Sequence, residues 1–337
     1  MVARVLTALA WVLLSLSYHG HATALTSTDQ QSDTLRALIE KLEDSHYVDR
    51  RYNDAMSREH LNSYLERLDP SHLYFTARDI ADFDRLATVL DDQGRKGNVT
   101  ASFEIFNRYE AIAAARLDEV IDTMDVRVGG FDFEVDEFIA SDPTERDWAV
   151  STAELDDRWR KRIKNQVLGL RLADKAPDDI ASTLRKRYEN QRLRLSQYNA
   201  QDVFAVYANA LTSQFGPHTS YFSPRRAENF DIDMKLSLEG IGAVLQNEDE
   251  YVKVVRVVPA GPADKQSNLK AAELIVAVGQ GDEGPMVDVI GWRLDDVVDL
   301  VRGKKGTVVR LDVIPASGRS DELRRLAIVR NEVRLEE

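Results

Sequence analysis

Between residues 35 and 215 the chain carries apolar positions at the 3.6-residue spacing of amphipathic helices. Segments with this spacing are 35–42, 61–68, 80–90, 103–124, 148–163, 180–188 and 202–215. Thr76, followed three residues later by Asp79, is typical of a helix capping box, and Pro177 stands where a helix can begin. The longest run predicts one helix that continues to a glycine pair at 129–130. We therefore expect an all-α domain whose aromatic residues form its core.

Beyond Phe230 the pattern changes to the alternation and short apolar runs that are typical of β-strands. The expected elements are strands over 241–246, 251–258, 274–278, 307–314 and 323–330, a short helix after Pro262 and a second helix over 294–301. Gly-Pro and Ser-Pro steps, which break helices, lie between the helical and the β-like patterns. We predict a multidomain chain, with an all-α domain over 25–228 and a small α+β domain over 229–330. The second domain is expected to be a partly open antiparallel β-barrel with two helices.

The N-terminus has a pattern of its own. Arg4 precedes an apolar run over 5–16, and Ala22-Thr23-Ala24 provides a small-residue cleavage site. This arrangement predicts a secretory signal peptide over 1–24, cleaved after Ala24, and a periplasmic location. A membrane anchor is the alternative, but the apolar run is too short for a comfortable span, and we expect no stable membrane span.

Composition narrows the classes of function. The formal charge is 44 − 57 = −13 and the isoelectric point is about 5.1, which argues against a nucleic-acid partner. Hydrophobic residues make up 43% of the chain and charged residues 30%, which is ordinary for a globular protein. The absence of cysteine excludes disulfide and thiolate chemistry.

Two glycines spaced two apart mark the start of the β-like region, in Leu-Glu-Gly-Ile-Gly-Ala at 238–243. Glycine lets successive backbone N–H groups turn toward one point, and such a nest attracts an anion. We predict that Gly240, Ile241 and Gly242 bind the terminal carboxylate of a peptide, while the following strand edge pairs with its backbone. Taken alone, the stretch favours the simpler interpretation of glycines at a turn before a strand.

The remaining groove residues follow from the predicted strand and the second helix. One wall is expected to consist of Ala243 and Val244, and the other of Val297, Val298 and Val301. No cofactor is expected, and no His or acidic pair has convincing metal spacing. His218 lies beside Ser220, but adjacency in sequence does not make a nucleophile and base, so a connector is the favoured interpretation.

Several motifs share their order with one family. They lie at 217–221, 238–243, 259–263, 278–281, 285–298 and 294–307, and the run over 285–298 is the most specific. Together they resemble the bacterial tail-specific, or carboxyl-terminal processing, proteases, and the second domain resembles their PDZ domain. The helical region and the signal peptide fit the same family.

The resemblance implies a periplasmic serine peptidase of the Ser/Lys dyad type, whose PDZ domain engages apolar C-termini of unfolded or exported proteins. In such a dyad a desolvated neutral lysine takes the serine proton and N–H donors hold the oxyanion. The family's dyad lies in a later domain with no counterpart in this sequence, so no catalytic residue is assigned. Residues 331–337 are expected to begin the link to that domain, and 303–307 form a turn before a strand.

One departure from the family and three interpretations remain. Ala272-Glu273 stands where the family usually has Gly-Asp, and a positive φ there would strain alanine.

The preferred interpretation is the N-terminal part of a tail-specific protease that binds peptide tails. A second is a peptidase whose catalytic domain comes from a second chain or from further sequence. A third is an interaction scaffold, whose helical domain docks a periplasmic partner such as a lipoprotein adaptor while the groove is idle.

Overall fold

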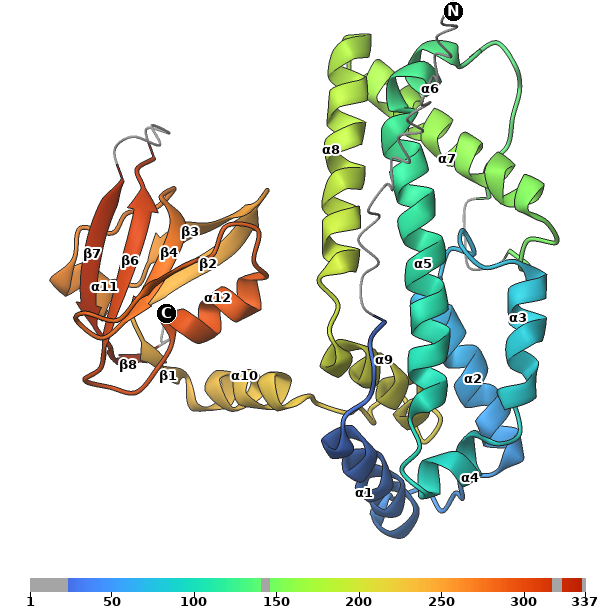
Figure 1. Ribbon diagram of the computed structural model, residues 1–337, viewed down its shortest axis with the longest axis horizontal. Helices are drawn as coiled ribbons and strands as arrows, with labels where there is room; N and C mark the ends of the chain where they lie inside the picture. Colours follow the sequence, from blue (N-terminus) through green and yellow to red (C-terminus); the bar gives the residue numbers. More distant parts are fainter. Residues whose placement is uncertain (1–23, 141–145, 317–322, 335–337) are drawn as a thin grey trace, which may run out of the picture.

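The computed structural model describes residues 24–140, 146–316 and 323–334. Its first part is helical, as Figure 1 shows, with the long helices α5 and α8 side by side. The elements are α1 (Asp29–Ser45), α2 (Asp54–Leu68), α3 (Ala77–Phe83), the 3-10 helix η1 (Asp84–Leu86), α4 (Leu90–Arg95), α5 (Thr100–Asp122), α6 (Met124–Gly130), α7 (Thr152–Leu172), α8 (Pro177–Ser196) and α9 (Ala200–Thr212). The predicted all-α domain is confirmed. None of the helices in the described ranges has the length and apolar character needed to cross a membrane.

Local sequence signals explain where several helices begin and end. The capping box predicted at Thr76 and Asp79 is present, and Pro177 occupies the first turn of α8. The helix predicted to continue to 129–130 is instead divided at Thr123, whose φ and ψ of −99° and 5° leave the α-helical range. The Thr123 hydroxyl donates to the carbonyl of Glu119 at 2.7 Å, a local bond that competes with the helical pattern.

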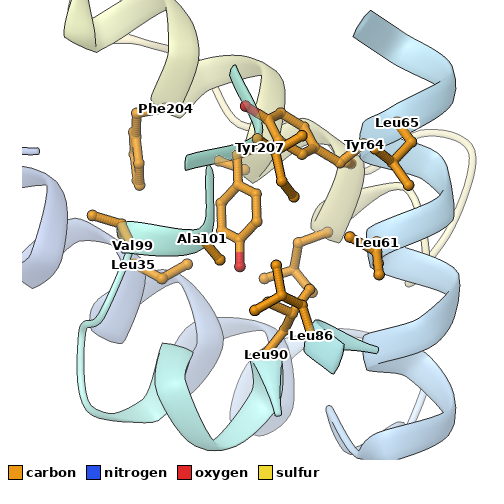
Figure 2. Packing of buried hydrophobic residues seen from close by; sticks show 14 of the residues in the cluster. Leu35, Leu61, Tyr64, Leu65, Leu86, Leu90, Val99, Ala101, Phe204 and Tyr207 are labelled. Atoms are coloured by element: carbon orange, nitrogen blue, oxygen red, sulfur yellow. The ribbon is translucent and has the colours of Figure 1, made fainter. Parts of the chain in front are cut away.

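The helical domain is held together by two buried clusters, one around α2 and α9 and one around α5, α7 and α8. Figure 2 shows the first, in which Tyr207 of α9 lies among leucines and Tyr64. A buried histidine completes this cluster. His60 Nδ1 accepts from the Tyr52 hydroxyl at 2.7 Å, and Nε2 faces the carbonyl of Tyr207 at 3.0 Å, so the proton is on Nε2. Burial lowers the pKa of His60 from 6.5 to about 4, which keeps the ring neutral near pH 7.

The second part of the chain is a small α+β domain. Its elements are α10 (Pro224–Lys235), β1 (Ser237–Gly240), β2 (Ala243–Glu248), β3 (Tyr251–Val257), α11 (Pro262–Gln266), β4 (Leu274–Gln280), β5 (Met286–Asp288), α12 (Leu294–Val301), β6 (Val308–Ile314), β7 (Arg324–Val329) and β8 (Asn331–Arg334). The strands are antiparallel in the order β2-β3-β4-β6-β7, with β5 beside β4 and a separate β1-β8 pair. A valine-rich core lies between this sheet and α12. The predicted α+β domain is confirmed.

The structure corrects three details of the sequence-based organisation. The boundary expected between 228 and 229 falls inside α10, a helix that the pattern did not predict and that contributes no buried residue. The first strand of the groove begins at Ala243, not at Ile241, because Gly242 turns the chain with a φ of +76°. Residues 331–334, expected to begin a linker, form β8 and pair with β1.

Polar contacts join the two domains. Arg293, just before α12, forms an ion pair with Asp202 of α9, and Gln197 donates to the carbonyl of Gly291 at 2.7 Å. Within the second part of the chain, Arg225 of α10 also contacts Asp296 of α12 at 2.9 Å. The loop before α12 and the first half of this helix are therefore tied to polar groups outside the sheet.

Candidate peptide-binding groove

The candidate site is a cavity of about 260 Å³ between β2 and the C-terminal half of α12. Its lining consists of Leu238, Gly240, Ile241, Gly242, Ala243, Val244, Leu245, Val258, Val298, Val301, Arg302 and Val333. Because β2 is an edge strand that pairs with β3 on one side, its other edge faces the cavity. An open edge presents backbone N–H and C=O groups to which an extended peptide can bind as an added strand.

The turn before β2 directs its carbonyls away from the groove. The carbonyl of Ile241 accepts from the N–H of Ala263 at 2.8 Å, and that of Gly242 accepts from Val258 at 2.8 Å. Within the described ranges, the N–H groups of Ile241 and Gly242 donate to no protein acceptor. Two neighbouring donors are thus left for an anion at the end of the groove. Gly240 differs from them, because it lies in β1 opposite Asn331.

Gly242 cannot be replaced freely. Its φ of +76° is in the left-handed region, which favours glycine. A Cβ at this position would also lie 3.4 Å from the Cα of Gly261 and 3.4 Å from Val333 Cγ2. A larger side chain would therefore press on both the α11 turn and β8.

Seven of the eight predicted site residues line the same cavity. They are Gly240, Ile241, Gly242, Ala243, Val244, Val298 and Val301. Val297 is a correction: it is 0% exposed and packs in the core beneath α12, not on the groove wall. Adjacent positions on a helix point about 100° apart, so Val297 and Val298 cannot both face the groove. The assignment of a peptide carboxylate to this cavity stays a prediction.

Sequence reasoning missed five lining residues. Leu238 and Val333 come from the β1-β8 pair, Leu245 from β2, and Val258 and Arg302 directly follow β3 and α12. Leu245 could have been found by counting two residues on from Ala243 along the strand, because alternate side chains share a face. Val333 carries no such signal, since it reaches the groove only through a pairing between distant segments.

A buried arginine holds the end of α12. Arg330 is 3% exposed, and its Nε and Nη2 donate to the carbonyls of Val301 and Leu300, each at 2.8 Å. Its Nη2 also donates to Gln280 Oε1 at 2.7 Å, and its Nη1 donates to Thr307 Oγ1 at 3.0 Å. Burial lowers the pKa of this guanidinium, but arginine remains charged in proteins. The last carbonyls of the groove helix are thereby satisfied.

The Ala272-Glu273 loop has the backbone strain that the sequence predicts. Ala272 has a φ of +67°, and its N–H donates to the carbonyl of Val254 at 2.8 Å. The Glu273 carboxylate is buried, forms an ion pair with Arg324 and accepts from the N–H of Lys270 at 3.0 Å. The pairing with β3 continues through this loop, so the strain does not disrupt the domain.

Other candidate chemistry is not supported by the geometry. His218 and Ser220 are both exposed, and the residue between them, Thr219, contacts His46 Nε2 at 2.8 Å. No group of three or more potential metal-ligating side chains occurs in the part of the chain that the structure describes. A larger cavity of about 1050 Å³ lies between the domains, with residues such as Tyr198 and Arg293 in its walls.

Comparison with known proteins agrees with this architecture. Residues 38–225 match the family model of the tail-specific protease N-terminal domain, and residues 230–314 match that of the PDZ domain. The tail-specific protease of Haemophilus influenzae is 36% identical over 319 residues, covering 92% of this chain and 44% of that protein. The carboxy-terminal processing protease CtpA of Bacillus subtilis is 29% identical over 151 residues, covering 44% of this chain and 31% of that protein.

Among solved structures, the PDZ domain of a carboxy-terminal protease from Vibrio cholerae, in complex with a peptide, is 47% identical to this chain. The match covers 30% of this chain and 100% of the Vibrio cholerae chain, with a TM-score of 0.28. The present chain spans less than half the length of the two curated relatives. The N-terminal family model matches more than half of the chain and a PDZ match follows it, so the chain belongs to the tail-specific protease family, with a helical N-terminal domain followed by a PDZ domain.

Proposed function

We propose that this chain is the N-terminal part of a periplasmic tail-specific serine protease and that its PDZ domain binds apolar C-terminal tails of protein substrates. The observation that carries the proposal is the open edge of β2, which lies along an apolar cavity. At the start of this edge, the N–H groups of Ile241 and Gly242 have no acceptor among the described residues. A peptide that extends the sheet at β2 places its last residue at the turn and its carboxylate near those donors. The substrates would be unfolded or exported proteins with exposed tails.

The lining of the cavity supports a preference for an apolar last residue. Leu245, Val298 and Val301 contribute side chains from both walls, and Leu238 and Val333 contribute from the β1-β8 pair. A volume of about 260 Å³ lies just below the roughly 300–1,000 Å³ of sites that enclose whole small molecules. The cavity therefore suits a short peptide segment better than a bulky ligand.

Proteolysis by a Ser/Lys dyad is the activity that the family resemblance implies, and this chain by itself is expected to lack it. Among the described residues, no serine hydroxyl forms a hydrogen bond with a lysine amine, the contact that a neutral lysine base needs. Incubation of residues 25–337 with an unfolded protein bearing an apolar tail should leave it intact. Cleavage that copurifies stoichiometrically with the chain and survives mutation of Ser220 would contradict this expectation.

The periplasmic location rests on the predicted signal peptide, of which residues 1–23 lie outside the described residues. Mass spectrometry of the exported protein should find Leu25 as the mature N-terminus, and a retained Met1 would overturn the location. An adaptor on the helical domain stays a prediction.

The binding experiment is fluorescence anisotropy with labelled peptides that have an apolar last residue and either a free or an amidated C-terminus. Hydrogen bonds to a charged group contribute roughly 1.5–3 kcal/mol, and about 1.4 kcal/mol corresponds to a tenfold change in affinity. Amidation should therefore weaken binding about ten- to a hundredfold. Replacing the last residue with Asp should abolish detectable binding. Equal affinity for both ends would instead favour the non-catalytic interaction scaffold.

A further inference from the structure

We propose that the cavity between the two domains binds the stretch of a substrate that precedes its C-terminal tail, with a preference for acidic residues. This inference rests on the peptide binding proposed above, and it extends that binding beyond the residues held in the groove. The ligand is an extended acidic segment of polypeptide that begins about five residues before the C-terminus.

Strand β2 leads from the groove into this cavity. Ala243, Val244 and Leu245 line the groove, whereas Asn247 on the same strand lines the interdomain cavity of about 1050 Å³. A peptide with its carboxylate at the turn before Ala243 runs antiparallel to β2, so its preceding residues lie successively closer to Asn247. At about 3.4 Å per residue in both strands, roughly the fifth residue from the C-terminus lies beside Asn247. The residues before it therefore leave the groove next to the cavity.

The helical domain forms the opposite wall of the cavity. Residues of α5, α8 and α9 line it together with Leu294 and Asp295 at the start of α12. Lys186 of α8 reaches Asp249, in the turn between β2 and β3, at 2.7 Å, so this end of the PDZ domain faces the helices (Figure 1). The cavity has about four times the volume of the groove, about 1050 Å³ against about 260 Å³. It can therefore hold several residues of an extended chain.

Arginines without acidic partners give the cavity a positive charge. Arg67 of α2, Arg194 of α8 and Arg226 of α10 line it, and none of them forms an ion pair among the described residues. Arg67 donates to the Ser63 hydroxyl at 3.4 Å, and the Arg226 Cζ lies 4.6 Å from the centre of the Phe222 ring. These partners are uncharged, so they leave both positive charges intact.

The two acids in the lining are already paired. Asp202 forms an ion pair with Arg293, and Asp295 lies 3.4 Å from Arg225. The chain as a whole carries a formal charge of −13, which repels acidic peptides. An attraction for acidic residues is therefore a local property of this cavity, and the three unpaired arginines supply it.

The test is fluorescence anisotropy on residues 25–337, with labelled peptides that share the same apolar C-terminal segment of about five residues. Their upstream segments contain either several acidic residues or the matching Asn and Gln. Each exposed ion pair contributes about twofold in affinity, so three arginines should favour the acidic peptide about tenfold, and added salt should reduce this preference. Moving the same acids into the C-terminal segment should weaken binding, because the groove is apolar.

A double variant assigns the preference to the cavity. Arg67→Gln/Arg194→Gln should leave only about a twofold preference for the acidic peptide. The matched control, Arg78→Gln/Lys175→Gln, removes two charges from exposed positions outside the lining and should keep a preference of about tenfold. A photo-crosslinking residue about seven positions before the C-terminus should label α8 or α9, whereas one at the last position should label only the PDZ domain.

The outcomes separate this inference from the proposed function. If acidic and neutral peptides bind the wild-type chain equally, the inference fails while binding in the groove stands. If the double variant keeps the full preference, or if the upstream label stays on the PDZ domain, the acids bind elsewhere and the cavity has no role. If no peptide binds at all, the proposed function fails and this inference fails with it.

Discussion

Replacing Arg330 with Met should selectively loosen the groove helix. The Met side chain has a similar length but no donors, so the carbonyl of Val301 loses its partner in a site where Arg330 itself is 3% exposed, while the carbonyl of Leu300 keeps only the Gln280 amide at 2.7 Å. An unsatisfied buried group costs about 1–3 kcal/mol, and the hydrogen bonds that the charged guanidinium makes to Leu300, Gln280 and Thr307 are lost in addition, at about 1.5–3 kcal/mol each before water and neighbouring groups compensate. Removing a buried charge recovers part of this cost. We expect a net loss of about 3 kcal/mol in the PDZ domain.

The assay is native-state hydrogen exchange followed by mass spectrometry. A loss of about 3 kcal/mol corresponds to roughly a hundredfold increase in opening. The increase should be confined to peptides from α12 and the flanking strands β4 and β6, while peptides from α5 and α8 of the helical domain stay unchanged. Circular dichroism cannot separate the two domains, whereas exchange assigns the effect to segments.

Two further variants make the reasoning on Arg330 refutable. Arg330→Lys keeps the charge but not the planar fork that reaches several acceptors, so it should lose most of the same stability. Arg334→Met, at an exposed position of β8, is the matched control and should change exchange little. A rise in opening of less than about fivefold in Arg330→Met, or an equal rise in the helical domain, would show that Arg330 does not hold α12.

Three further predictions follow from individual residues. Ala272→Gly should stabilise the PDZ domain by about 0.5–1 kcal/mol in urea unfolding, because relief of a positive φ exceeds the added chain entropy; a lower midpoint would contradict this. Burial lowers the pKa of His60 from 6.5 to about 4, so the unfolded chain binds the proton more tightly. Its contribution is complete above pH 6.5 and should fall by about 3 kcal/mol as the pH drops to 4, a loss that His60→Gln should flatten in unfolding curves measured across that window. Gly242→Val should weaken peptide binding much more than Gly291→Val, because the φ values of +76° and +77° match but only at Gly242 would the Cβ already touch Gly261 and Val333 and leave no room for further methyl groups. Equal effects in anisotropy would show that only backbone strain matters.

The sequence by itself determined the domain order and most of the groove. The 3.6-residue spacing requires one apolar face for each helix, and the change to strand-like spacing after Phe230 marks the second domain. Gly240 and Gly242 were recognisable because glycine spacing reports a backbone requirement, which is local. The strain at Ala272 was also predictable, since a positive φ penalises any Cβ wherever the loop lies.

Only the tertiary structure decided which side chains face the groove. Val297 and Val298 are chemically alike neighbours, and the docking angle of α12 buries the first while the second lines the cavity. Val333 reaches the groove through the pairing of β1 with β8, two segments separated by most of the domain. In the sequence, Arg330 is an ordinary charged residue at the end of a predicted strand. Its burial depends on three carbonyls, which the fold brings around its guanidinium. The periodicity of a segment identifies its apolar face. The segment that packs on this face comes from a distant part of the sequence, so no local pattern identifies it.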